Sequence, residues 1–221
     1  FPTIWRPRST KRFFLHYRVD HTTMLLQVCI KRARSSRASA DLVDQHAFTG
    51  VAVALRQAQT EEFKAYQVQT LANADTMAKE MMAKGYHVVS GGTENHLILV
   101  NLKNSKDIDG ARVENVCDKV QITLNKNSVP GDKSALNPGG MRLGAHALTS
   151  RGFKEAEFKR VVELVDKAVE IAKEAKAKTK TIKEFNAFIA DDAEINAKCD
   201  ALRSEVNGFA LKYPMPGFDG H

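Results

Sequence analysis

Apolar residues recur at helical spacing over the first clearly patterned stretch of the chain. Between Val51 and Lys84, large apolar side chains recur at roughly helical spacing, as Phe63, Tyr66, Leu71, Met77 and Met81 do. Thr60 is followed by two glutamates, a pattern typical of a helix start, and Gly85 suits the left-handed conformation that ends a helix. We therefore predict a long helix over 51–84 that breaks and restarts near Thr60.

The period of the pattern then changes to two. Tyr86–Ser90 and His96–Leu102 are short runs rich in apolar and branched residues, separated by a glycine-containing stretch. Such runs predict two adjacent strands joined by a tight turn. Further short strands are predicted at Gln121–Leu124 and Met141–Leu143.

The last third of the chain is patterned as helices. An apolar stripe after Thr149 or Ser150 predicts a long helix capped by one of these two hydroxyl groups. Shorter helices are predicted over Ile182–Ala190 and Ala193–Leu211. With a further amphipathic helix over Asp109–Val120, these elements indicate helices packed on one face of a small sheet, an α+β arrangement.

Composition narrows the class of protein. A chain of 221 residues with 43% hydrophobic content can bury one sizeable core. Its apolar runs fall far short of the roughly 18 to 20 residues that cross a bilayer, so we predict no membrane segment. Cys29, Cys117 and Cys199 are odd in number, widely spaced and without histidine at metal-ligand spacing. This pattern argues against a disulfide framework and a metal site, and it favours a reducing compartment.

Positive charge is concentrated at the N-terminus. Residues 1–46 carry nine Lys and Arg against three Asp, which leaves +6 of the total net charge of +7. Such an arm could bind nucleic acid or act as a targeting peptide. We favour a non-native or spliced-in segment, and we consider nucleic-acid binding unlikely because charge alone carries no specificity. The predicted division is a basic arm over 1–46, a connecting helix over 47–85 and a small domain over 86–221.

The most specific chemical signal surrounds Arg142. This arginine stands in the glycine-rich stretch NPGGMRLG at 137–144, which is followed by ALTSRG at 147–152. A fixed guanidinium in such a turn suits bidentate binding of a small carboxylate. The segment NKNSVPGDKSAL precedes it at 125–136, and YPMPGF follows at 213–218.

Together these segments resemble the serine hydroxymethyltransferase family, over about four-fifths of the chain, from about His46 to the C-terminus. Members of that family use pyridoxal phosphate to move a one-carbon unit between serine and tetrahydrofolate, with glycine as the other amino acid. The resemblance implies an α/β fold class: the C-terminal part of a fold-type-I pyridoxal-phosphate transferase, with a leading long helix, a small sheet and C-terminal helices. It also implies a homo-oligomer in the intact enzyme, in the cytoplasm or the mitochondrion.

The resemblance assigns roles to five residues. Arg142 matches the arginine that binds the carboxylate of serine or glycine, and the alternative is a structural ion pair at the surface. Asn127 matches a residue that hydrogen-bonds the pteridine ring of folate, and the alternative is an amide that completes a turn. Ser134, Ala135 and Leu136 fall where relatives contact folate, mainly through backbone groups.

One element of the family pattern is missing from this sequence. Relatives attach the cofactor to a lysine in a Thr-Thr-Thr-His-Lys segment, and this chain has no such segment. Because the chemistry requires that amine, we assign no catalytic residue and expect no turnover by the chain alone. The start at Phe1 without an initiator methionine indicates a piece of a longer product or an imperfect gene model. The alternative function is a non-catalytic fragment, or a regulatory partner of full-length subunits.

The histidines and glycines indicate no other chemistry. His87, His96 and His146 lack a spaced carboxylate or nucleophile that would predict a catalytic triad. His46 is interpreted as a local hydrogen-bonding group, and Arg151 as a structural residue. The glycines around Arg142 do not form a dinucleotide-binding fingerprint.

Overall fold

The computed structural model describes residues 40–132 and 137–216, with side chains described from residue 47 onward. The predictions for the basic arm, for Ser134, Ala135 and Leu136, and for the side chain of His46 lie outside the described residues. The elements follow in this order: α2 (Ala40–Ala58), α3 (Glu61–Ala83), β1 (His87–Val88), the 3-10 helix η1 (Val89–Gly91), β2 (Leu97–Asn101), α4 (Leu102–Lys106), α5 (Gly110–Lys119), β3 (Asn125–Asn127), β4 (Gly140–Gly144), α6 (His146–Thr149), α7 (Glu155–Ala177), α8 (Ile182–Asp191) and α9 (Ala193–Ala210).

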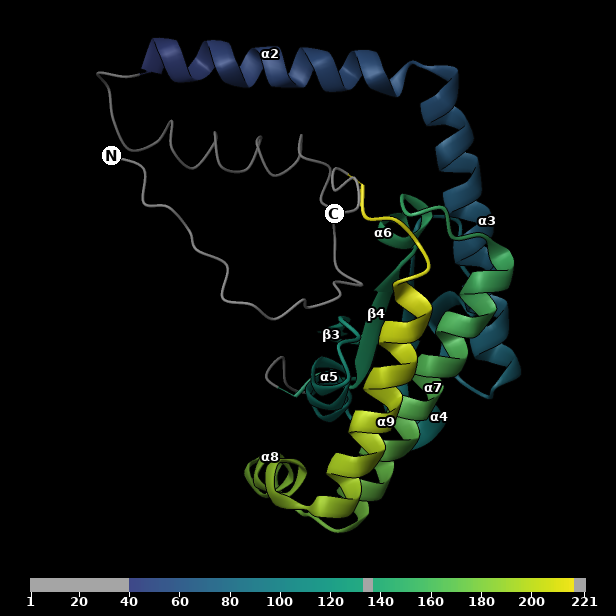
Figure 1. Cartoon of the computed structure of the whole chain (residues 1–221), viewed down its shortest axis with the longest axis vertical. Coiled ribbons are helices and arrows are strands. Elements are labelled where there is room, and N and C mark those ends of the chain that lie inside the picture. The colour runs from purple at the N-terminus through teal and green to yellow at the C-terminus, as the bar shows by residue number, and fades with distance from the viewer. Residues whose placement is uncertain (1–39, 133–136, 217–221) are drawn as a thin grey trace.

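The described part of the chain is mostly helical, around one small antiparallel sheet with the strand order β1-β2-β4-β3. Figure 1 shows α3, α7 and α9 running along the body of the molecule, while α2 extends across one end of it, away from the sheet. The buried sheet residues Val100, Met141, Ile98 and Leu143 join a core with residues of α3, α5, α7, α8 and α9. Helices thus cover one face of the sheet, as predicted.

The leading helix breaks where the sequence predicts. Helix α2 ends at Ala58, and Thr60 caps α3 by accepting a hydrogen bond from the backbone N–H of Phe63 at 3.2 Å. Gly85 has a φ of +80°, the left-handed conformation predicted for it. The predicted start at Val51 is wrong, because the helix begins at Ala40.

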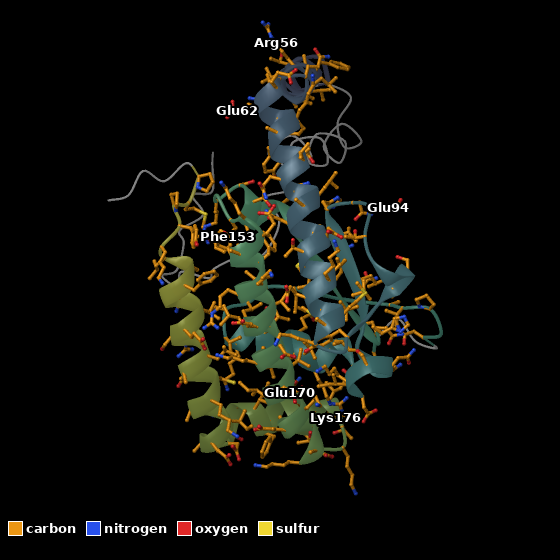
Figure 2. All side chains as sticks on the ribbon, turned by 90° about the vertical axis from the view of Figure 1, so that its right-hand side faces the viewer. Arg56, Glu62, Glu94, Phe153, Glu170 and Lys176 are labelled. Carbon is orange, nitrogen blue, oxygen red and sulfur yellow. The ribbon has the colours of Figure 1, made fainter. Side chains whose placement is uncertain are left out.

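The error at the start of α2 has a physical reason. Phe48 is 72% exposed and Leu55 is 61% exposed, so this helix buries little apolar surface within the described residues. A helix without a buried face leaves no clear apolar period in its sequence. Arg56 and Glu62, labelled in Figure 2, lie at the end of the molecule where α2 meets α3.

Two further boundaries differ from the predictions. The strand predicted at Gln121–Leu124 instead forms at Asn125–Asn127, because Gln121 takes a left-handed φ of +64° and the buried Ile122 and Leu124 lie in irregular chain. The alternation of apolar residues over 121–124 therefore reflects the burial of Ile122 and Leu124, not pairing with another strand. The hydroxyl of Thr149 does not cap the long helix, since it donates to Ala145 O at 2.8 Å within α6.

The long helix α7 begins six residues later than that cap, at Glu155, with Lys154 in the N-cap position. A third boundary also differs, because the strand predicted over Tyr86–Ser90 covers only His87–Val88 and the chain continues as the 3-10 helix Val89–Gly91, not as a tight turn. The other predicted elements agree closely with the structure. Strands β1 and β2 pair antiparallel, α5 is capped by Asp109, and α8 and α9 differ from their predicted bounds by one residue each.

A buried amide joins α3 to the start of α7. Asn73 is fully buried, and its Nδ2 donates to Thr149 Oγ1 at 2.8 Å and to the backbone oxygen of Phe153 at 2.9 Å. Its Oδ1 accepts from Gln69 Nε2 at 3.0 Å. Phe153, labelled in Figure 2, packs in turn against Tyr213 with the ring centroids 4.1 Å apart. The amide therefore satisfies buried oxygens in two other segments of the chain, at Thr149 and at Phe153.

A pair of histidines lies where α3, β2 and α6 meet. The rings of His96 and His146 are 4.3 Å apart between centroids, and Tyr66 lies 6.1 Å from His146. Burial and the positive charge of Arg142 lower the pKa of His96. Burial, and then the neighbouring His96, lower the pKa of His146. Both imidazoles are therefore neutral at pH 7.

Within the described residues, no helix is long and apolar enough to cross a bilayer. The division of the chain at residues 46 and 85 stays a prediction.

Replacing Asn73 by Ala should lower the free energy of unfolding by about 2 to 3 kcal/mol, because the buried oxygens of Thr149 and Phe153 lose their donor. Urea denaturation measures this change. Val68→Ala is the matched control, since Val68 is on the same helix but 69% exposed, and it should change stability by less than about 0.5 kcal/mol. Equal effects of the two substitutions would contradict the role given to the amide.

Acidification should destabilise the fold through the histidine pair. The pKa of each imidazole is lowered in the folded chain, so the unfolded chain binds more protons below about pH 6.5, and unfolding becomes more favourable there. The free energy of unfolding should fall from pH 7.5 to pH 5. The double variant His96→Asn, His146→Asn should lose part of this pH dependence, whereas His87→Asn, at an exposed position, should keep it.

Candidate functional site

Alternation along β4 separates its side chains between two environments. Met141 and Leu143 are buried in the core, whereas Arg142 projects from the opposite face of the sheet and is half-buried. The register places Arg142 directly opposite Leu99 on β2 and opposite Asn125 on β3. The face away from the core, which we call the open face, therefore carries a cationic fork between an apolar side chain and an amide.

The surroundings of Arg142 bear on its predicted role as a carboxylate-binding residue. Among the described residues, its guanidinium makes no hydrogen bond and no ion pair, which does not favour the alternative of a structural surface pair. The central position of β4, paired on both sides, fixes the backbone that carries the side chain. A planar, permanently charged fork on a rigid strand suits a carboxylate with little loss of entropy on binding. Its role remains a prediction.

Asn127 lies on the same face, diagonally across from Arg142. It pairs with Gly140, two residues before Arg142 on β4, so the two side chains emerge on the same side of the sheet. Its Nδ2 donates to the backbone oxygen of Ser128 at 3.0 Å, as expected of an amide that completes a turn. This contact uses one donor and leaves the other polar positions of the amide for a second partner.

Asn125 is a candidate that sequence reasoning missed. It faces Arg142 across the strand pair, and no hydrogen bond of its side chain is formed within the described residues. Its spacing of two from Asn127 is the signal that could have found it, because both must emerge on one face if the segment is a strand. The predicted strand ended at Leu124, one residue too early for that inference.

The loop between β3 and β4 is closed at its base by Asp132. The side chain is 5% exposed, and its Oδ2 accepts from the backbone N–H of Gly139 at 2.7 Å and of Val129 at 3.0 Å. Its Oδ1 accepts from Lys103 Nζ at 2.9 Å. The hydrogen bond from Gly139, followed by those from Lys103 and Val129, lowers the pKa of Asp132 to about 2. The carboxylate is therefore charged throughout the physiological range.

The end of this loop packs without space for side chains. A Cβ on Gly140 would lie 2.4 Å from Val129 Cγ1, and one on Gly110 would lie 2.1 Å from the backbone oxygen of Gly140. The N–H of Gly110 also donates to Pro138 O at 2.8 Å, which docks the start of α5 against the loop. Glycine is therefore required at both positions for β4 to hold its place.

The remaining predicted residues take structural positions. The guanidinium of Arg151 donates to the backbone oxygens of Ala210, Tyr213 and Pro214, so it caps the end of α9. The fold brings His96 and His146 together, although they are far apart in the sequence. Within the described ranges, no three His, Cys, Asp or Glu side chains gather as a metal site would require.

The sequence of this chain is similar to a family of known proteins. The profile of the family "Serine hydroxymethyltransferase" matches residues 43–165. The chain is 48% identical over 174 residues to "Serine hydroxymethyltransferase, cytosolic" of Candida albicans, covering 77% of this chain and 36% of that protein. It is 46% identical over 178 residues to the protein of the same name from Oryctolagus cuniculus, covering 79% and 37%.

A third relative is "Serine hydroxymethyltransferase, cytosolic" of Saccharomyces cerevisiae, 43% identical over 174 residues, covering 77% of this chain and 36% of that protein. The chain thus spans about a third of the length of the curated relatives it matches. The family profile covers more than half of the chain, through α3, the whole sheet and the first part of α7. The chain belongs to the serine hydroxymethyltransferase family.

Proposed function

We propose that this chain forms the amino-acid and folate-binding part of a serine hydroxymethyltransferase, which interconverts serine and glycine with transfer of a one-carbon unit to tetrahydrofolate. The observation that carries the proposal is the guanidinium of Arg142. It stands on the open face of the sheet without a partner among the described residues, next to two asparagines of β3. The family membership and the segment NKNSVPGDKSAL support the same assignment.

The residues of the open face have separate tasks in this proposal. Arg142 binds the carboxylate of serine or glycine with two parallel hydrogen bonds and so fixes the orientation of the Cα substituents. Asn125, opposite it, hydrogen-bonds either the same carboxylate or the guanidinium. Asn127 hydrogen-bonds the pteridine ring, while Ser134, Ala135 and Leu136 contact folate mainly through their backbone.

The cofactor of the family, pyridoxal phosphate, supplies the electron sink for bond cleavage at Cα when it is bound. The residues described here do not fit its attachment. Lys126 pairs with Glu114 and Lys103 pairs with Asp132, so both lysines near the site are engaged as cations. Among the described residues these two lysines therefore offer no free amine for the cofactor, and we assign this chain no catalytic residue.

The alternative is a non-catalytic chain that acts on full-length subunits as a regulatory partner. Exposed apolar residues on α2 and α3, such as Phe48 and Val68, would suit contacts with other subunits. In either case we expect a homo-oligomeric intact enzyme, in the cytoplasm or the mitochondrion.

Arg142→Ala should weaken the binding of serine. The test grafts residues 47–221 in place of the matching third of the Candida albicans relative, which supplies the rest of the enzyme. Loss of a bidentate charge pair costs roughly 2 to 5 kcal/mol, so the apparent affinity for serine should fall by well over about tenfold. Arg142→Lys should recover only part of this loss, because an ammonium cannot form the fork.

Arg56→Ala is the matched control, since Arg56 is exposed at the far end of the molecule in Figure 2. It should leave serine binding unchanged. A graft in which Arg142→Ala binds serine with normal affinity would overturn the assignment. If the chain is instead a regulatory partner, adding it in excess to the intact Candida albicans enzyme should change that enzyme's activity.

A further inference from the structure

Strands β3 and β4, which carry the candidate ligand groups, are joined by one loop. Asn127 ends β3 and Gly140 begins β4, so the loop covers residues 128–139. The ladder between the strands has three residue pairs, from Asn125 opposite Arg142 to Asn127 opposite Gly140. So short a ladder needs additional restraints to hold its register.

One carboxylate oxygen supplies such a restraint at both ends of the loop. Asp132 Oδ2 accepts from the N–H of Val129, two residues after Asn127, and from the N–H of Gly139, three residues before Arg142. The backbone N–H of Asp132 also donates to Val129 O at 3.1 Å. A single side chain thereby fixes the distance between the end of β3 and the start of β4.

The same point is tied to the end of β2. The backbone oxygen of Gly139 accepts from the N–H of Leu102 at 3.0 Å and of Lys103 at 3.2 Å, and Lys103 Nζ reaches Asp132 Oδ1. A Cβ on Gly139 would lie 2.8 Å from Asp132 Oδ1 and 2.8 Å from Lys103 Cδ. The Asp132 carboxylate therefore joins three strands: β3 through Val129, β4 through Gly139 and β2 through the start of α4.

Resting on the function proposed above, we infer that Asp132 is a positioning residue for both ligands of the open face. Its carboxylate sets the spacing of β3 and β4, and with it the separation of the folate-binding amide of Asn127 from the carboxylate-binding guanidinium of Arg142. It touches neither ligand itself. Its loss moves both groups together, because each stands within three residues of a backbone N–H that Asp132 holds.

The inference has a kinetic signature in the grafted enzyme. Asp132→Ala removes both backbone contacts, and the KM values for serine and for tetrahydrofolate should both rise, by about tenfold, since a displacement of about 1 Å is enough for such losses. Arg142→Ala, in contrast, should affect serine alone. Lys103→Met keeps both loop contacts and removes the ion pair, which is half-exposed on the lysine side, so each KM should rise less than about threefold.

Folding is measured separately in the full 221-residue chain. Far-ultraviolet circular dichroism and the midpoint of thermal unfolding report whether each variant retains the fold, and amide hydrogen exchange at Gly139 reports the loop contact itself. Faster exchange at Gly139 in a folded Asp132→Ala chain, with both KM values raised, is the expected result. Asp132→Asn, which keeps an oxygen for the two N–H groups, should recover part of both losses.

Two failures are distinguishable. An unsubstituted graft that binds neither serine nor tetrahydrofolate would contradict the proposed function. A graft that binds both normally, and continues to do so with Asp132→Ala, would overturn the positioning role and leave the proposed function intact. If Asp132→Ala does not fold, Asp132→Asn and Lys103→Met decide: unchanged KM values in Asp132→Asn, despite faster exchange at Gly139, would also overturn the role.

Discussion

The structure depends most on the pairing of β4 between β2 and β3. This strand sends Met141 and Leu143 into the core and Arg142 to the opposite face, because side chains alternate along an extended backbone. A slip of one residue would bury the guanidinium and expose two large apolar groups. Burial of those two side chains, worth about 1.5 to 3 kcal/mol each, is therefore what holds the arginine in place.

The helices pack against the face of the sheet that carries Met141 and Leu143. Residues of α3, α5 and α7 form a continuous core with the buried face of the sheet. The buried amide of Asn73 fastens α3 to the chain that follows α6, which itself follows β4. The close approach of Gly110, at the start of α5, to the backbone of Gly140 fixes how near α5 lies to β4. The site thus inherits its geometry from packing on the far side of the sheet.

The sequence predicts well those elements that bury one face within this chain. Helices α5, α8 and α9 show a clear apolar stripe. The observed bounds of α8 and α9 differ from the predicted ones by one residue at the C-terminal end, and those of α5 by one residue at each end. The sequence predicts poorly those segments in which the spacing of apolar residues does not match the burial of their side chains. Helix α2 is largely exposed where its side chains are described, so its start had no signal, and Ile122 and Leu124 are buried without a partner strand. Thr149 has the hydroxyl group of a helix cap, but this group donates to Ala145 O within α6 and accepts from Asn73 Nδ2.

The residues of the candidate site also differ in whether the sequence predicts them. Arg142 and Asn127 could be nominated from motifs, because local sequence carries them. Asn125 could have been nominated from its spacing of two to Asn127 if the strand had been predicted at 125–127. Asp132 could not, because its importance follows from contacts with distant residues such as Lys103, 29 positions away. The left-handed turn at Gln121, which delays β3, is a further case in which the fold overrides a local apolar pattern.

The claim that Arg142 recognises a carboxylate can be measured on the chain itself. In nuclear magnetic resonance spectra of the folded protein, the Arg142 side-chain Nε–H signal should shift on titration with glycine. It should not shift with glycinamide, which keeps the amine but lacks the carboxylate. An Arg142 signal that stays unchanged with glycine up to saturating concentrations, or that responds equally to both compounds, would contradict the account.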